Sequence, residues 1–284
     1  MTTQTISQDY QIRGNPARPV LEVGDLIYND LGQLALAKLN EKFRGNPNIA
    51  YQDLPEQNQP ISFSNRPRAL AINQILREET NNQIRVLSPE EVVQYWQAIP
   101  DKSATYADTN SVSVFPNQGP NETLRKRVLE ILGKNSKNLE VPFYVHDLGV
   151  EPADNKYGFT FTETDYTKAT EAPFLQKNQK VKYDPKTRVL VPSEDHKDVY
   201  IWTPYDQSGL RGNCRYGGGC LLFRDYDLLN SNSSGRVQVV KDPQGLAENL
   251  DELVNELQIE RDKKIAETQT NYEKALKVLR TGKL

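Results

Sequence analysis

Residues 213–234 read NCRYGGGCLLFRDYDLLNSNSS, between WTPYDQSGLRG at 202–212 and GRVQVV at 235–240. This window contains no Lys, Glu, Gln, Met or Trp, although these five types make up 61 of the 284 residues of the chain. Every residue type in the window can be reached from an Asn codon of the form AAY by changing only its adenines. The composition therefore indicates that this one segment follows a different rule from the sequence on either side.

The chemistry of the window suits a binding surface. Rigid aromatic rings, Arg and small adaptable polar groups are typical of paratopes, and the lack of Lys and Glu removes long side chains whose ordering opposes binding. The window lies between two predicted strands, 199–203 and 237–240, and we expect it to be a long excursion on a sheet. Excursions longer than about 12–15 residues are usually functional or disordered, and the leucines of the window favour local packing.

Two interpretations of the window stay open: a loop of accidental composition, or a ligand-facing surface on a fixed frame. The residues expected to form the frame are Trp202, Leu210, Leu221, Leu228, Gly235 and Val237–Val240. Those expected to contact a ligand are Cys214, Tyr216, Gly217, Gly218, Cys220, Leu222, Phe223, Arg224, Asp225, Tyr226, Asn230, Asn232 and Ser233. The side chains among them expected to be exposed are Tyr216, Gly218, Cys220, Phe223, Arg224, Asp225, Tyr226, Asn230, Asn232 and Ser233.

Helical signals dominate the sequence before residue 133. After a polar arm at 1–19, leucine spacing predicts a helix over 20–43, and 46–65 reads as loop. Further helices are predicted over 68–79, with Pro67 in the first turn, and over 90–98. The second of these is opened by a capping box from Ser88 to Glu91. A last helix over 122–132 has Asn121 as its cap and ends at Gly133.

Strands are predicted at 84–87 and 111–115, and a β-rich half runs from 141 to 204. After Pro243 the pattern changes to a long amphipathic helix over 245–280, with leucines at heptad spacing. Such a helix cannot bury its apolar stripe alone. It packs within the chain, pairs with a second copy, or forms a coiled coil with a specific partner.

The bulk composition argues against some classes of function. The net charge is −3, whereas a general binder of nucleic acid or anionic membrane shows a basic footprint. The N-terminus has no apolar segment typical of a secretory signal, and no stretch is long and apolar enough to span a bilayer. We expect a soluble protein made in the cytoplasm, which needs carriage on another protein or particle for any role at a surface.

Catalytic signatures are missing from the sequence. It contains no HExxH, CxxC, GxSxG or P-loop motif, and Gly217–Gly219 lacks the Lys and helix start of a phosphate cradle. His146 and His196 are isolated, which is typical of structural histidines. Asp225 and Asp227 have no specific spacing for a hard cation. We therefore expect no catalytic residue, no metal site and no cofactor.

The window and its flanks resemble a known class. The segment resembles the variable region of proteins targeted by diversity-generating retroelements, most of all those of small-genome archaea and their viruses. The resemblance lies in WTPYDQSGLRG, the diversified stretch that follows it, and SGRVQVV. In that class a reverse transcriptase mutates adenines copied from a template repeat, which would account for the AAY-compatible composition. The resemblance covers roughly residues 84–243. In many such proteins the variable region lies near the C-terminus, whereas a further segment follows it here.

The resemblance implies an α+β fold of the C-type lectin-like type, in which two helices and a twisted antiparallel core display the variable residues. It also implies a non-enzymatic receptor-type protein that binds a protein or cell-surface ligand, and no nucleic acid. Calcium and sugar are not expected, because the EPN or QPD triplets of calcium-dependent lectins are missing. The expected divisions are an arm and helical segment at 1–83, the lectin-like domain at 84–243 and the terminal helix at 244–284.

Two alternative functions stay open. The formylglycine-generating enzymes share the broader lectin-like fold and use cysteines, so Cys214 and Cys220 could form a copper or redox site. These are the only cysteines in the chain, so the fold does not depend on a disulfide framework. The other alternative is a structural homo-oligomer assembled through 245–280, with the window as a passive loop.

Overall fold

The computed structural model describes residues 22–241, apart from 97–105, 136–138, 196–197, 218, 226 and 232. The chain divides into residues 1–242 and 243–284, and everything described here belongs to the first unit. The predicted arm at 1–19, the predicted helix at 245–280 and His196 lie outside the described residues. Among the described residues, no helix has the length and apolar character needed to cross a bilayer.

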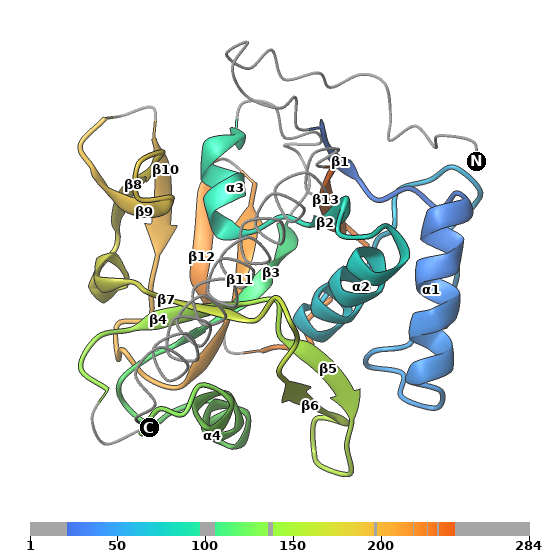
Figure 1. Cartoon of the computed structure of the whole chain (residues 1–284), viewed down its shortest axis with the longest axis horizontal. Coiled ribbons are helices and arrows are strands. Elements are labelled where there is room, and N and C mark those ends of the chain that lie inside the picture. Colours follow the sequence, from blue (N-terminus) through green and yellow to red (C-terminus); the bar gives the residue numbers. More distant parts are fainter. Residues whose placement is uncertain are drawn as a thin grey trace, which may run out of the picture. The chain divides into compact units, whose positions relative to one another are not determined.

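A large twisted sheet is the centre of this mixed α+β unit (Figure 1). Its strand order is β1-β13-β3-β11-β12-β10-β8-β9, with β2 paired to β13, β4 to β3, and β7 to β4. The β13–β3 and β10–β12 pairs are parallel and the other pairs in this sheet are antiparallel. The strands are β1 (Glu22–Asp25), β2 (Ile84–Val86), β3 (Tyr106–Val114), β4 (Phe143–His146), β5 (Gly149–Pro152), β6 (Phe159–Thr162), β7 (Lys168–Glu171), β8 (Gln179–Asp184), β9 (Val189–Ser193), β10 (Val199–Trp202), β11 (Leu210–Tyr216), β12 (Cys220–Asp225) and β13 (Gly235–Lys241). β5 and β6 form a separate hairpin.

Two hydrophobic cores lie on opposite faces of the sheet. The helices are α1 (Asp30–Lys42), α2 (Arg66–Glu79), α3 (Pro89–Gln94), α4 (Glu122–Ile131) and the 3-10 helix η3 (Pro173–Gln176). Side chains of α1, α2 and α4 build the first core, and those of α3 and η3 contribute to the second. Neighbouring residues Val239 and Val240 of β13 enter different cores, as the alternation of side chains along a strand requires.

Two helix starts confirm their sequence signals. α2 follows Asn65, whose side chain accepts a hydrogen bond from the Arg68 amide at 3.0 Å, and Pro67 occupies its first turn. At the start of α3, Ser88 Oγ accepts from the Glu91 amide at 3.2 Å, while Glu91 Oε2 accepts from the Ser88 amide at 2.9 Å. This is the complete capping box, although the helix ends at Gln94, before the predicted 98.

The start of α4 corrects the predicted cap. Asn121 precedes the helix but has a left-handed backbone, with φ 59°, and its side chain makes no cap bond. Its Nδ2 instead donates to the carbonyl of Leu210 at 2.9 Å and so ties the helix to β11. At the other end Gly133, with φ +60°, stops the helix as expected.

The predicted helix over 20–43 is wrong for residues 22–29. Glu22–Asp25 is a strand that pairs with β13, and the helix begins only at Asp30, after the Asn29 cap. The sequence near residue 22 has no local signal for this pairing, because its partner lies more than 200 residues further along the chain. β1, which lies before the boundary expected at residue 83, pairs with β13, and side chains of α1 and α2 pack in the same core as those of α4.

A buried ion pair joins α3 to β4. His146 Nε2 lies 3.3 Å from Glu90 Oε1, which also accepts a hydrogen bond from the Tyr144 hydroxyl at 2.6 Å. Burial alone raises the pKa of Glu90, but the charge of His146 and the two hydrogen bonds outweigh it and lower the pKa to about 2. Burial likewise lowers the pKa of His146, but the carboxylate of Glu90 outweighs it, so that this pKa is raised. Glu90 therefore holds the imidazole of His146 in place between α3 and β4.

The pair of Glu90 and His146 should stabilise the fold only between a lower and an upper pH limit. The raised pKa of His146 means that its share is complete below about pH 6.5 and is lost as the pH rises through the folded-state pKa. The lowered pKa of Glu90 means that its share is present above about pH 4.3 and is lost as the pH falls towards 2. We expect a double-mutant cycle of Glu90→Gln and His146→Gln, followed by urea unfolding, to give a coupling of about 0.5–3 kcal/mol near pH 5.5. The same coupling at pH 5.5 and at about pH 9 would contradict this assignment.

Candidate ligand-binding surface

The window is part of the sheet, not an excursion from it. Its first residues extend β11, and Cys220–Asp225 form β12, which pairs antiparallel with β11. β11 is bonded on its other side to β3, and β12 to β10, so both window strands are internal. Gly217 and Gly219 lie in the turn between the two strands, where Gly219 has φ +88°. The prediction of a long excursion is wrong because these neighbouring strands provide hydrogen bonds along both edges of the hairpin.

Alternate residues of β12 face opposite sides of the sheet. Leu221 and Phe223 are both fully buried and belong to the core beneath α3. The residues between and beside them, Cys220, Leu222 and Arg224, therefore point to the other side, where the first two are half-buried and Arg224 is exposed. One strand thus carries both core and surface residues within a few positions.

β10 continues this outward side of the sheet. Tyr200 lies opposite Cys220 in the parallel pair, and the two rings of Tyr200 and Trp202 pack edge to face at 5.1 Å. Trp202 lies opposite Leu222, and the guanidinium of Arg224 lies over the Trp202 ring at 4.9 Å from its centroid. Three strand positions from two segments of the chain are therefore in direct contact.

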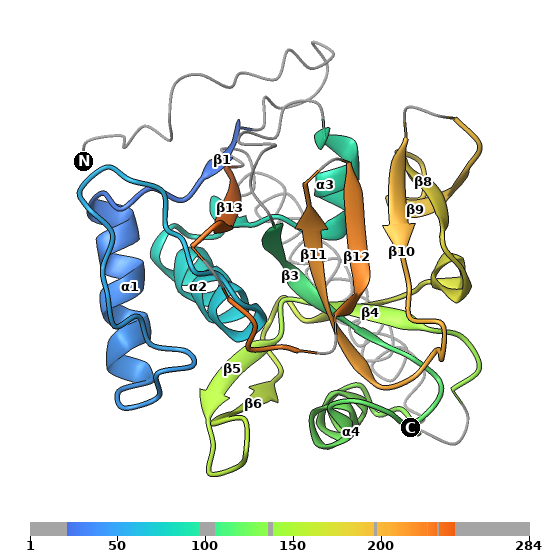
Figure 2. The same cartoon turned by 180° about the vertical axis from the view of Figure 1, so that it is seen from behind.

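Tyr216 extends the same side onto β11. It lies opposite Cys220 in the antiparallel pair and is 45% exposed. We call the following residues the exposed sheet face: Tyr200, Trp202, Tyr216, Cys220, Leu222 and Arg224. Figure 2 shows this side, with β10, β11 and β12 towards the viewer, α1 and α2 beside them and α4 below. No helix of the described part of the chain covers these three strands here.

An ion pair marks where the exposed sheet face ends. Arg66, at the start of α2, lies 3.0 Å from Asp108 of β3, and both side chains are buried. The Arg66 side chain runs so close to Gly212 that a Cβ there would lie 2.2 Å from its Nε. Cys214 pairs with Asp108 and is only 1% exposed. Towards β3 the same side of the sheet is thus closed over by the start of α2.

Two polar window residues are buried parts of the frame. Arg215 Nε donates to Gln238 Oε1 at 2.9 Å, and the Gln238 side chain donates in turn to Asp25 of β1 at 3.0 Å. Asn213 sits at a bulge of β11 and bonds the side chains of Ser111 and Ser113 at 2.9 and 2.7 Å. Both residues belong to the AAY-compatible set, so nothing in the sequence distinguished them from surface positions.

The end of the window is a loop fixed at two points. Leu228 is buried in the core with α1 and α2. The carbonyl of Asn230 accepts a hydrogen bond from the Tyr106 hydroxyl at 3.1 Å, and Tyr106 pairs with Tyr216. The side chains of Asn230 and Ser233 are exposed. Asn230 therefore lies beside the exposed sheet face, with its carbonyl bonded to Tyr106 and its side chain exposed.

The predicted ligand contacts fall into distinct groups. Exposed, as expected, are Tyr216, Arg224, Asn230 and Ser233, while Gly217, Cys220 and Leu222 are half-buried. Phe223 and Cys214 are buried at 0% and 1% exposure, so their expected access to a ligand is wrong. Gly218, Tyr226 and Asn232 lie outside the described residues, and the side chain of Asp225 is not described. Of the expected frame, Leu210, Leu221, Leu228, Gly235 and Val237–Val240 are buried, whereas Trp202 is half-exposed and lies on the surface.

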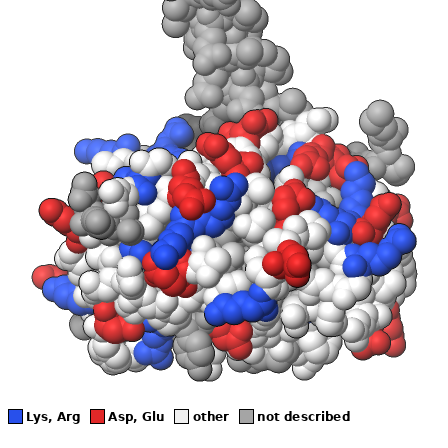
Figure 3. All heavy atoms as spheres, turned by 90° about the horizontal axis from the view of Figure 1, so that it is seen from below, with Lys and Arg blue, Asp and Glu red and all other residues white. Residues whose placement is uncertain are grey.

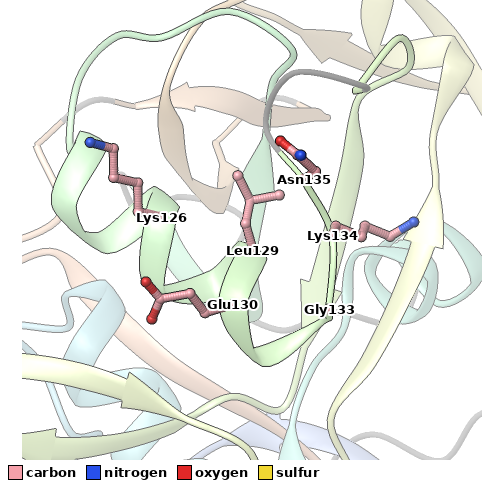
Figure 4. A pocket seen from close by; sticks show the side chains of 6 residues that line it. All are labelled: Lys126, Leu129, Glu130, Gly133, Lys134 and Asn135. Carbon is pink, nitrogen blue, oxygen red and sulfur yellow. The ribbon is translucent and has the colours of Figure 1, made fainter.

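Elsewhere in the described chain, a hollow of about 280 Å³ is lined by residues that include Asn73, Arg77, Asp147 and Tyr166, and Arg77 Nη2 lies 3.0 Å from Asp147 Oδ2 there. Cys214 and Cys220 are not joined by a disulfide, and no group of three or more His, Cys, Asp or Glu in the described residues could hold a metal. A shallow hollow of about 400 Å³ at the end of α4 has Leu129 at its centre (Figure 4). The charged ends of Lys126 and Lys134 point away from each other there. On the face shown in Figure 3, acidic and basic side chains are interspersed.

Comparison of the chain with protein-family models, with curated proteins and with solved structures finds no match. The case for a site therefore depends on the geometry of the sheet and on the composition of the window.

The alternation in β12 predicts a large loss of stability for one substitution and a small one for its neighbour. Phe223→Ser removes a fully buried ring and should lower the free energy of unfolding by about 3–5 kcal/mol. Arg224→Ser changes an exposed side chain and removes its contact with the Trp202 ring, which should cost no more than about 1 kcal/mol. Urea unfolding of the two variants measures both values. Similar losses in the two would show that the strand does not divide core from surface in this way.

Proposed function

We propose that the chain is a non-enzymatic binding protein whose exposed sheet face recognises a ligand and is diversified by a retroelement. The observation that carries this proposal is the outward position of Tyr216, Cys220, Leu222 and Arg224, all of which belong to the AAY-compatible window. Asn230 and Ser233 add exposed window positions beside them. Side chains at such positions can be exchanged without entering either core.

The small stability cost of substitutions at exposed positions supports diversification of this surface. A substitution at an exposed position usually changes stability by no more than about 0.5 kcal/mol, whereas truncating a buried aromatic ring costs about 3–5 kcal/mol. A domain stable by about 5–15 kcal/mol tolerates many changes of the first kind and few of the second. The internal position of β11 and β12, bonded on both sides, holds the backbone still while the outward side chains change.

We further propose that the domain is of the C-type lectin-like type. The support is a mixed α+β unit in which helices flank a twisted, largely antiparallel sheet and the sheet itself carries the window. The unit would include β1 and α1 as well as the range that the sequence resemblance suggested, because both belong to the same fold. The expected ligand is a protein or a cell-surface molecule.

Sequencing the gene and its surroundings in related isolates tests the diversification. We expect an imperfect repeat of the window beside a reverse-transcriptase gene, with mismatches at adenines. Variation should concentrate in the codons for Tyr216, Cys220, Leu222, Arg224, Asn230 and Ser233.

The inward codons of the same window are the internal control. Those for Asn213, Arg215, Leu221 and Phe223 should stay constant, because their side chains are buried. A locus without a repeat and a reverse transcriptase, or variation spread evenly over inward and outward codons, would refute the proposal.

A further inference from the structure

The outward residues of the two window strands are too few to form a complete protein-binding surface. Neighbouring strands lie about 4.8 Å apart and alternate residues about 6.8 Å apart, so these side chains cover roughly 10 Å by 14 Å of sheet. A standard protein interface buries about 800 Å² on each partner. Any ligand of ordinary size that rests on β11 and β12 must therefore also contact the elements beside them.

β10 is the neighbour that lies within reach. Tyr200 and Trp202 face the same side as Cys220 and Leu222, directly across the strand pair. β10 is held between β12 and β8, so its backbone is bonded on both sides. The two rings pack against each other at 5.1 Å, which restricts their rotation before any ligand arrives. Side chains that are already ordered lose little entropy on binding.

Tyr200 and Trp202 also differ from the outward residues of β11 and β12 because they lie outside the AAY-compatible window. Residues 200 and 202 lie before the window and therefore escape the codon rule that marks 213–234. Trp, which is absent from the window, cannot be made from an AAY codon by changing its adenines. Trp and Tyr are nonetheless the residue types most enriched at binding hot spots. The exposed sheet face thus has a constant half on β10 and an exchangeable half on β11 and β12.

We propose, on the basis of the proposed function, that Tyr200 and Trp202 are a constant anchor shared by all diversified forms, and that the ligand is a folded protein. The Tyr200 and Trp202 rings stand at 65° to each other, so this constant pair does not form one flat platform for a sugar to stack upon. Lys180 of β8 lies opposite Tyr200 on the same side. An apolar centre with charged groups around it is the usual anatomy of a protein–protein interface.

The test uses full-length chains displayed on yeast, with the codons for Tyr216, Cys220, Leu222 and Arg224 randomised to NNY. Binders are selected on serum albumin, which serves as a model folded protein. Trp202→Ala and Tyr200→Ala are then introduced into each independent clone and the Kd is measured by titration. We expect Trp202→Ala to weaken most clones about tenfold or more, whatever their window sequence, with partial recovery in Trp202→Phe.

Tyr166→Ala is the matched control. Tyr166 is 41% exposed and also lies beneath a guanidinium, that of Arg77 at 4.5 Å, but on a different part of the fold. It should leave the Kd unchanged, and thermal unfolding of every variant reports whether the fold is retained.

The outcomes separate this inference from the function on which it rests. Clones that bind albumin but keep their affinity without Trp202 and Tyr200 would overturn the constant anchor and leave the diversified surface standing. A library that yields no binder would overturn the proposed function, and the anchor with it. Titrating the wild type with chitohexaose gives a separate result: a saturable change in Trp fluorescence that disappears in Trp202→Phe would assign the surface to sugars and overturn the protein ligand.

Discussion

The separation of core from surface depends on the two-residue alternation of side chains along β10 and β12. Ile201 and Leu221, opposite each other in this pair, are fully buried. Their packing fixes the register, because a slip by one residue would turn every apolar side chain to the other side. The same register places Trp202 beside Leu222. What holds the hairpin in the sheet is therefore also what sets its outward residues side by side.

Buried polar groups set the limits of that surface. The ion pair between Arg66 and Asp108 closes the sheet towards β3, and the chain of bonds from Arg215 through Gln238 to Asp25 links the window to the first strand. A buried charge that loses its partner costs several kcal/mol. Such groups add specificity to the arrangement of strands, and they make their own positions poor candidates for exchange.

Local signals predicted local structure well and long-range structure poorly. The proline of α2 and the capping box of α3 are contained in a few adjacent residues, and both helices begin within two residues of the predicted position. β1 was missed because only its distant partner β13 makes it a strand. The window was predicted to be an excursion because it lies between two predicted strands, whereas its own strands depend on their neighbours β3 and β10. Phe223 was placed outside for the same reason: without strand assignments its alternation with Arg224 cannot be read.

Composition and geometry answer different questions about the window. The AAY-compatible composition shows which residue types a mutational process could have produced, and it includes buried Asn213 and Arg215 as readily as exposed Tyr216. Geometry decides which of those products a folded chain can accept. A surface made only of exchanged residues would have no contact with its ligand that is common to all forms, because each new combination of side chains alters every contact. Ordered aromatic rings on the adjoining strand would supply a fixed part of the binding energy, so that exchange on β11 and β12 would have to provide only the difference between one ligand and another.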